Sequence, residues 1–275
     1  MAWATPLGAA EPQTNTDVAA KFTIYVGGML ILEGNFGAQV SGDTYALSTD
    51  MATAGTIARF FPATYKLRGE GEIREGDLVP EKFVSDQQSK RETRLMTLTY
   101  GADRMPHARP VPAFEPEQED EIKEITPDMR RATSDPISAF LMPVKEGVNP
   151  CDRKVQVFDG RRRYNLTFAY QQNKMVTPPD ASKPKSEAVA RDTLVCTVIY
   201  EAIAPADLKR RMEKTKRRQD DMRVWFAPFD GGRIYMPVRF ELRTPIGMAV
   251  MELQNLTEIQ MAANPSSAPK QLAQR

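Results

Sequence analysis

The stretch Lys21-Phe-Thr-Ile-Tyr-Val-Gly27 alternates strongly apolar residues with more polar ones. In an extended chain, Phe22, Ile24 and Val26 therefore point to the same face. This period of two is typical of a strand in an antiparallel sheet that has one buried face.

Further strand signals follow at short spacing, separated by turn residues. Met29–Glu33 comes after the pair Gly27-Gly28, which we interpret as a bulge or kink within one continuing strand. Residues 35–40 and 44–49 flank Ser41-Gly-Asp43 and predict a hairpin, since Gly tolerates a positive φ and Asp can hydrogen-bond its own backbone. The other strands predicted in this half are residues 64–73, 82–88 and 92–100.

Two segments of this half do not follow the strand pattern. Residues 51–61 are compatible with a short helix or a wide strand, and Pro62 ends either one. Residues 103–130 are rich in proline and carry an acidic cluster from Glu115 to Glu124. We expect residues 103–130 to form an irregular, solvated loop.

A short helix is predicted next. Ser134-Asp135-Pro136 offers an N-cap followed by Pro at the first helical position. Apolar side chains then follow i, i+3, i+4, i+7 spacing, at Ile137, Phe140, Leu141 and Val144. Pro143 limits this helix to about two turns, and we expect its apolar face to pack against the sheet.

A second run of strands completes the chain. Asp159-Gly160 and Asp230-Gly-Gly232 are hairpin turn signals, and residues 173–190 predict a loop. The strands predicted here are residues 155–159, 163–171, 194–202, 222–228, 233–244 and 246–256. We expect a single, mainly β domain over residues 21–258, between residues 1–20, a signal-peptide remnant or disordered N-terminus, and residues 259–275, a disordered tail.

Charge and apolar content exclude two classes of protein. Lys and Arg total 37 against 36 Asp and Glu, a net charge of +1, whereas broad capture of nucleic acid needs a strong basic excess. No apolar run approaches the roughly 18 residues of a membrane-spanning helix. We therefore expect a water-soluble mature chain that does not bind nucleic acid.

The two cysteines, Cys151 and Cys196, each lie beside a strand-like run. They could be buried free thiols. They cannot complete a usual four-ligand metal site, since His107 is the only histidine. We prefer a disulfide between Cys151 and Cys196, which requires an oxidising compartment.

Catalytic motifs are missing from the sequence. His107 has no recognisable nucleophile or orienting partner, and Gly69-Glu-Gly71 is interpreted as a turn rather than a phosphate cradle. There is no Gly-x-Ser-x-Gly motif, P-loop, His-Glu-x-x-His motif or dinucleotide fingerprint. We expect a protein that is not an enzyme and needs no cofactor or metal.

One charge run stands out between two predicted strands. Its basic residues are Lys209, Arg210, Arg211, Lys214, Lys216, Arg217 and Arg218. The run could be no more than a solvated hairpin tip. It could also contact an anionic surface, such as lipid head groups or an acidic partner.

The strands at 222–229 and 233–242 are the most apolar part of the chain and interleave aromatic residues with arginine. Such a pattern suits the ordinary core of a curved sheet. It also suits a concave face that holds a lipid-like ligand. The pattern leaves open whether the helix after Pro136 fills that face.

Several segments together resemble the bacterial family called domain of unknown function 3108 (DUF3108). The resemblance extends over about residues 21–258. The segments that carry it are Tyr25-Val-Gly-Gly-Met29, Asp135-Pro-Ile-Ser-Ala-Phe140, Val155-Gln-Val-Phe-Asp-Gly-Arg-Arg-Arg-Tyr164, Cys196-Thr-Val-Ile-Tyr-Glu-Ala-Ile203, Arg223-Val-Trp-Phe226, Arg233-Ile-Tyr-Met-Pro-Val-Arg239 and Gly247-Met-Ala-Val-Met-Glu-Leu253.

The resemblance implies a large curved antiparallel sheet, a half-barrel or β-spiral, with the short helix packed in its concave face. It also implies a signal peptide and a periplasmic location. The start Met1–Ala10 is similar to the end of such a peptide but lacks its basic region. Two functions remain open: an envelope protein that binds or carries a lipid or lipoprotein, and a scaffold that contacts envelope partners through charged loops.

Overall fold

The computed structural model describes residues 14–177, 190–207, 210 and 222–262. Within these described residues, fourteen strands form one antiparallel sheet in the order β7-β6-β5-β4-β3-β2-β1-β14-β13-β12-β11-β10-β9, and β8 pairs with β13. Two meanders therefore spread in opposite directions from the central pair β1–β14, which joins the two ends of the domain. The predicted mainly β fold with one large antiparallel sheet is confirmed.

The strands of the first meander are β1 (Thr14–Val26), β2 (Met29–Ser41), β3 (Thr44–Thr53), β4 (Ala63–Arg74), β5 (Asp77–Ser89), β6 (Thr93–Tyr100) and β7 (Pro106–Val111). Those of the second are β8 (Met142–Pro143), β9 (Arg153–Phe158), β10 (Arg163–Val176), β11 (Arg191–Ala204), β12 (Arg223–Phe229), β13 (Ile234–Thr244) and β14 (Gly247–Ala262). Among the described residues, the helices with both ends placed are α1 (Ile57–Phe60), α2 (Pro116–Lys123), α3 (Pro127–Arg130) and the 3₁₀ turns η1 (Ser138–Phe140) and η4 (Asp230–Gly232).

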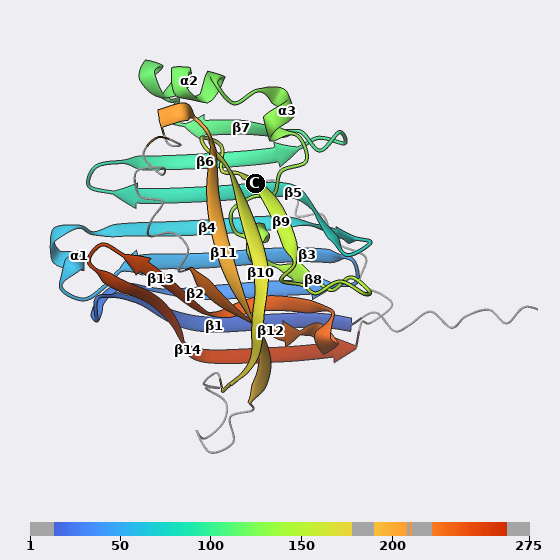
Figure 1. Ribbon diagram of the computed structural model, residues 1–275. Helices are drawn as coiled ribbons and strands as arrows, with labels where there is room; N and C mark the ends of the chain where they lie inside the picture. The colour runs from blue at the N-terminus through green and yellow to red at the C-terminus, as the bar shows by residue number, and fades with distance from the viewer. Residues whose placement is uncertain (1–13, 178–189, 208–209, 211–221, 263–275) are drawn as a thin grey trace, which may run out of the picture.

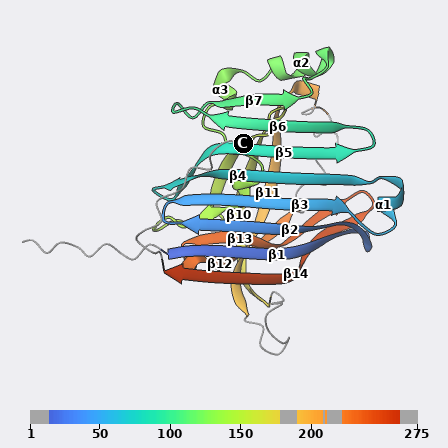
Figure 2. The same ribbon diagram turned by 180° about the vertical axis from the view of Figure 1, so that it is seen from behind.

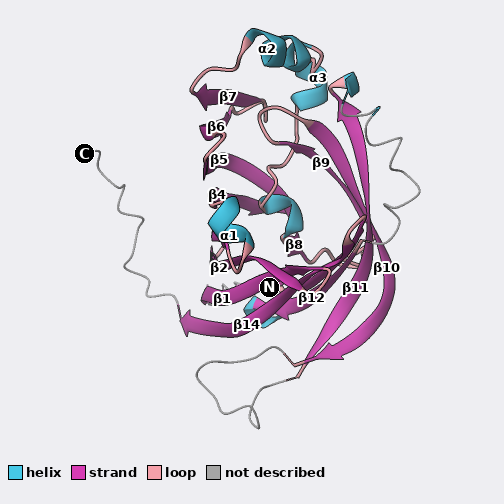
Figure 3. Cartoon of the chain, turned by 90° about the vertical axis from the view of Figure 1, so that its left-hand side faces the viewer, coloured by secondary structure: helices cyan, strands magenta, loops and turns pink. Residues whose placement is uncertain are grey.

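The sheet curls so that its two halves face each other. Strands β1–β7 and β14 form one layer, and β9–β11 cross it steeply on one side (Figure 1; seen from behind in Figure 2). Figure 3 shows the sheet bending round from β14 through β12 to β10, with α2 and α3 at one end of the gap. Strands β7 and β9 are the two edges, so the curved sheet stays open.

The predicted alternation sets the inner face of the sheet. On β1, Val18, Ala20 and Phe22 are buried, while Ala19 and Lys21 between them are exposed. Three clusters of buried apolar side chains line the interior, and the largest joins β1–β3 to β11–β14. Burial of one face of every long strand is the main favourable contribution to this fold.

The predicted loop at residues 103–130 is wrong, since it contains β7, α2 and α3. Pro106 and Pro110 are tolerated in β7 because an edge strand has no ladder partner on its outer side. Helix α2 begins with Pro116 and a capping box between Glu115 and Gln118. In this segment proline therefore begins a helix and lies in an edge strand, and it does not mark an irregular loop.

Three predicted boundaries also differ from the structure. Residues 14–20 belong to β1 and pair with β14, and from residue 15 on they also pair with β2. Residues 259–262 continue β14. Gly27-Gly28 is not a bulge within one strand but a two-residue hairpin turn, because Val26 pairs with Met29. Both glycines have the positive φ that such a turn requires. Residues 1–13 and 263–275 lie outside the described residues.

The predicted two-turn helix is a single 3₁₀ turn, η1. After Phe140 the chain extends, since Met142 and Pro143 pair with β13. Val144 therefore leaves the predicted apolar face and is exposed. The turn itself does pack inside the curved sheet, as expected.

Candidate functional site

The segment that carries η1 is held in the interior by a buried carboxylate. Asp135 Oδ1 accepts hydrogen bonds from the backbone N–H groups of Ile137 (3.0 Å) and Ser138 (2.9 Å). Tyr45 on β3 donates its hydroxyl to Ser138 Oγ at 3.2 Å. The two bonds to Asp135 fix the backbone of the turn, and the bond from Tyr45 holds the turn against β3. Ile137 packs against the buried core.

A glycine in β4 makes this close approach possible. A Cβ atom at Gly69 would lie 2.8 Å from Ile137 Cγ2 and 3.0 Å from Ser138 Oγ. Gly69-Glu-Gly71, interpreted from the sequence as a turn, instead lies within β4. Any larger residue at this position would push η1 away from the sheet.

Between η1 and the sheet lies an apolar cavity of about 370 Å³. Its lining comes from β1–β4, the η1 segment and β12–β14, and Thr49 is its one polar residue. The lining residues are Phe22, Ile24, Phe36, Leu47, Thr49, Met51, Leu67, Pro136, Ile137, Phe140, Leu141, Val224, Met236, Pro237, Phe240, Met251 and Leu253. The η1 segment therefore occupies only part of the concave face.

Several inward apolar side chains keep part of their surface accessible. Phe36, Leu67 and Leu253 point to the inner face of their strands but are only half-buried, whereas their neighbours Ala38 and Leu47 are buried. Accessible apolar surface in a hollow is a common property of ligand pockets. The arrangement can accept an apolar group without unfolding of the core.

Asp135 and Tyr45, which hold η1, are buried, and Tyr100 on β6 is partly buried. Burial raises the pKa of Asp135 to about 6, although the hydrogen bonds from Ser138 and Ile137 act to lower it. Burial and the charge of Asp135 also raise the pKa of Tyr45 and Tyr100 well above the usual range. The tyrosines thus remain neutral at all ordinary pH values.

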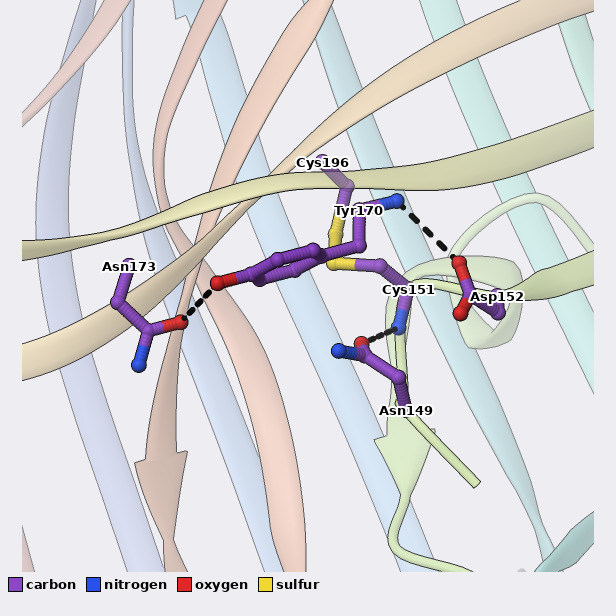
Figure 4. Close-up of a disulfide and its surroundings, with 6 residues drawn as sticks. All are labelled: Asn149, Cys151, Asp152, Tyr170, Asn173 and Cys196. Atoms are coloured by element: carbon purple, nitrogen blue, oxygen red, sulfur yellow. Dashed lines mark hydrogen bonds between the residues drawn. A yellow bond between two sulfur atoms is a disulfide. The ribbon is translucent and has the colours of Figure 1, made fainter.

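The predicted cysteine pair lies within disulfide distance. The sulfur atoms of Cys151 and Cys196 are 2.00 Å apart, their Cα atoms 5.6 Å apart, and both residues are fully buried. The bond joins the segment before β9 to β11, with β10 between them in the sheet (Figure 4). Beside it, Tyr170 on β10 donates its backbone N–H to Asp152 Oδ1 at 3.4 Å. The disulfide therefore links the chain on the two sides of β10, before β9 and within β11.

Of the predicted anionic-surface contacts, the structure describes Arg210 alone, which is exposed and lies 3.6 Å from Asp207. Outside the described residues lie Lys209, Arg211, Lys214, Lys216, Arg217 and Arg218. His107 is exposed on β7 rather than in a loop. The prediction for the basic run thus stays a prediction.

Neither a metal-binding cluster nor a membrane-spanning helix is present among the described residues. They contain no group of three or more His, Cys, Asp or Glu side chains placed to hold a metal ion. They also contain no helix that is both long and apolar enough to cross a membrane.

The fold and the cavity define the class: an open, barrel-like antiparallel β-protein with an apolar hollow on its concave side. The chain belongs to the family described as protein of unknown function (DUF3108), whose profile matches residues 21–254. The resemblance seen in the sequence is thereby confirmed.

A solved structure gives a weaker similarity. The chain is similar to a β-barrel-like protein of domain of unknown function DUF1849 from Brucella abortus, at 10% identity and a TM-score of 0.46. The match covers 89% of this chain and 98% of that one. No curated protein matches the sequence.

Sequence reasoning left open whether the concave face is filled, and it missed the role of Gly69. A glycine inside a strand does signal close approach of another group, so Gly69 could have been recognised once residues 64–73 were assigned to a strand. The cavity has no comparable local signal, because its lining comes from many elements brought together by the curvature of the sheet.

Proposed function

We propose that this protein is a non-enzymatic, periplasmic protein of the bacterial cell envelope that binds or carries the apolar chain of a lipid or lipoprotein. The observation that carries this proposal is the apolar cavity of about 370 Å³ between η1 and the sheet. Its volume falls in the range of about 300–1,000 Å³ typical of small-molecule sites. Its lining favours an aliphatic ligand over a polar one.

The buried cysteine pair supports the proposed location. Stable disulfides form mainly in oxidising compartments such as the periplasm, and Cys151 and Cys196 are paired in the interior of the domain. The alternative function is a scaffold that contacts envelope partners through charged loops. That alternative needs no interior hollow, so the cavity favours the ligand-binding proposal.

The proposal is tested by native mass spectrometry of the protein purified from its own periplasm, followed by titration with a fluorescent fatty acid. Co-purified lipid and saturable uptake of the probe are expected. An empty protein that takes up no probe would support the scaffold instead.

Two neighbouring residues of β14 give a matched pair of variants. Leu253 lines the cavity, whereas Gln254 is exposed on the opposite face. Leu253→Trp should fill part of the hollow and weaken probe binding about 10-fold or more, a loss of about 1.4 kcal/mol. Gln254→Trp adds the same side chain outside the cavity and should leave binding unchanged. Melting temperatures of both variants control for overpacking.

A further inference from the structure

Four large apolar side chains are exposed to solvent at one end of the domain. Met29 is 61% exposed, Phe60 65%, Phe61 56% and Ile246 73%. Single exposed hydrophobic residues are common, but a group of four on adjacent turns is a feature of interaction surfaces.

These residues come from three separate parts of the chain that meet at this end. The β1–β2 turn contacts the β13–β14 turn, where the Gly27 N–H donates to Met248 O at 3.0 Å. Next to it, the segment leading into α1 packs on the start of β2, with Ala54 N–H donating to Ile31 O at 2.9 Å. In Figure 1 these turns lie together at the left, and in Figure 3 α1 faces the viewer. We call this surface, formed by Met29, Phe60, Phe61 and Ile246, the α1 end.

Basic side chains flank the apolar ones. Arg59 is exposed in α1, and Lys90 and Arg91 are exposed in the β5–β6 turn. That turn lies beside the end of the α1 segment, since Ser89 pairs with Ala63. No ion pair joins these three cations to any residue that the structure describes, whereas the neighbouring Glu92 is bound to Arg94 at 2.7 Å. The local excess charge is therefore positive.

The apolar cavity extends toward the same end. Its lining includes Ile24, two residues before the end of β1, and Met51, two residues before the end of β3. The turn with Met29 follows β1, and α1 follows β3. An apolar ligand entering here would pass between side chains that are themselves apolar.

We propose that the α1 end docks on the surface of an anionic lipid bilayer. Met29, Phe60, Phe61 and Ile246 would enter the boundary between head groups and acyl chains, as the apolar face of an interfacial segment does. Arg59, Lys90 and Arg91 would meet the lipid phosphates, each contributing attraction that falls with salt. This inference rests on the proposed function, because docking of the α1 end would bring the ligand-binding cavity to the membrane.

A bilayer fits this surface better than a protein partner does. The apolar side chains stand on the tips of turns rather than across a flat sheet face, and unpaired cations border them. Protein interfaces bury large matched surfaces and exclude charge from their centre. Projecting apolar tips bordered by cations match a fluid surface with anionic head groups.

The test is sedimentation of the full-length protein with vesicles of phosphatidylcholine and phosphatidylglycerol in equal parts, compared with phosphatidylcholine alone. Binding to the anionic vesicles is expected, and weakening with salt. The double variant Phe60→Ser, Phe61→Ser should lower the partition coefficient about 10-fold or more, given the apolar area withdrawn from the bilayer. The triple variant Arg59→Ser, Lys90→Ser, Arg91→Ser should abolish the preference for anionic vesicles.

The matched control is the exposed apolar pair Val144 and Val148, at the other end of the strands beside the β4–β5 turn. Val144→Ser, Val148→Ser should leave vesicle binding unchanged. Equal binding by this control and the phenylalanine variant would overturn the proposal. The proposal would also be overturned if vesicle binding were lost only on substitution of Arg210, Arg211, Arg217 and Arg218. Probe uptake without vesicles is measured separately, so a failure of docking is distinguishable from a failure of ligand binding.

Discussion

The carboxyl group of Asp135 is fully buried, and burial raises its pKa from 3.8 to about 6. The folded state therefore binds this proton more tightly than the unfolded state does. Stability contributed by the protonated group is fully present below about pH 4 and is lost as pH rises through about 6. A pKa raised from 3.8 to about 6 changes the free energy of unfolding by about 3 kcal/mol.

Asp135→Asn should remove this dependence while keeping the side-chain oxygen that caps η1. The free energy of unfolding of the variant, relative to the parent, should rise by about 3 kcal/mol between about pH 4 and pH 7. Urea titrations at several pH values measure it. A difference that is constant over this range would show that Asp135 ionises normally in the folded protein.

Gly69→Ala tests how tightly η1 is held against β4. The new methyl group would lie 2.8 Å from Ile137 Cγ2, so the turn must shift. We expect a loss of about 1–3 kcal/mol, the usual cost of overpacking. Glu70→Ala, on the exposed face of the same strand, is the control and should change stability by less than about 0.5 kcal/mol. Equal melting temperatures of the two variants would contradict a tight contact.

At the scale of elements, the disulfide ties the segment before β9 to β11 across β10. Cys151→Ser and Cys196→Ser remove the same bond and should each lower stability by about 2–4 kcal/mol. A reductant should lower the free energy of unfolding of the parent by a similar amount and leave that of both variants unchanged. Thiol labelling of denatured, unreduced protein is the direct check, and two reactive cysteines would contradict the pairing.

At the scale of the whole molecule, the segment from α2 to Ser134 spans the gap between the edge strands β7 and β9. Ile125 is buried in one cluster with Phe83 of β5 and Phe158 of β9. The Ser134 backbone N–H donates to Gln156 O of β9 at 2.7 Å. This segment therefore covers the open sheet at one end, where β7 and β9 do not pair with each other. We call residues 116–134 the strap.

Ile125→Ala should therefore cost about 2–5 kcal/mol, as a core truncation does. The exposed Met129 of α3 supplies the control, because Met129→Ala should change stability by less than about 0.5 kcal/mol. Denaturant unfolding measures both. Similar small losses would mean that the strap only lies on the surface.

The sequence by itself determined most of the strands, the three hairpin turns after Ser41, Phe158 and Phe229, and the cysteine pair. These features depend on residues close together in the chain, such as the alternation in β1 and the Gly-Asp turn after Ser41, or on there being just two cysteines. The same local reasoning failed at Gly27-Gly28, because a bulge and a hairpin turn use the same glycine signal. It failed at residues 103–130 because proline can begin a helix or lie on a sheet edge.

Only the tertiary structure decided how the sheet curves and what its interior holds. The pairing of β1 with β14 joins residues more than 200 positions apart, such as Phe22 and Leu253, and no local pattern specifies it. The cavity, the burial of Asp135 and the α1 end all depend on that pairing and on the curvature of the open sheet. Each consists of residues that are ordinary in the sequence and become a site when strand curvature brings them together.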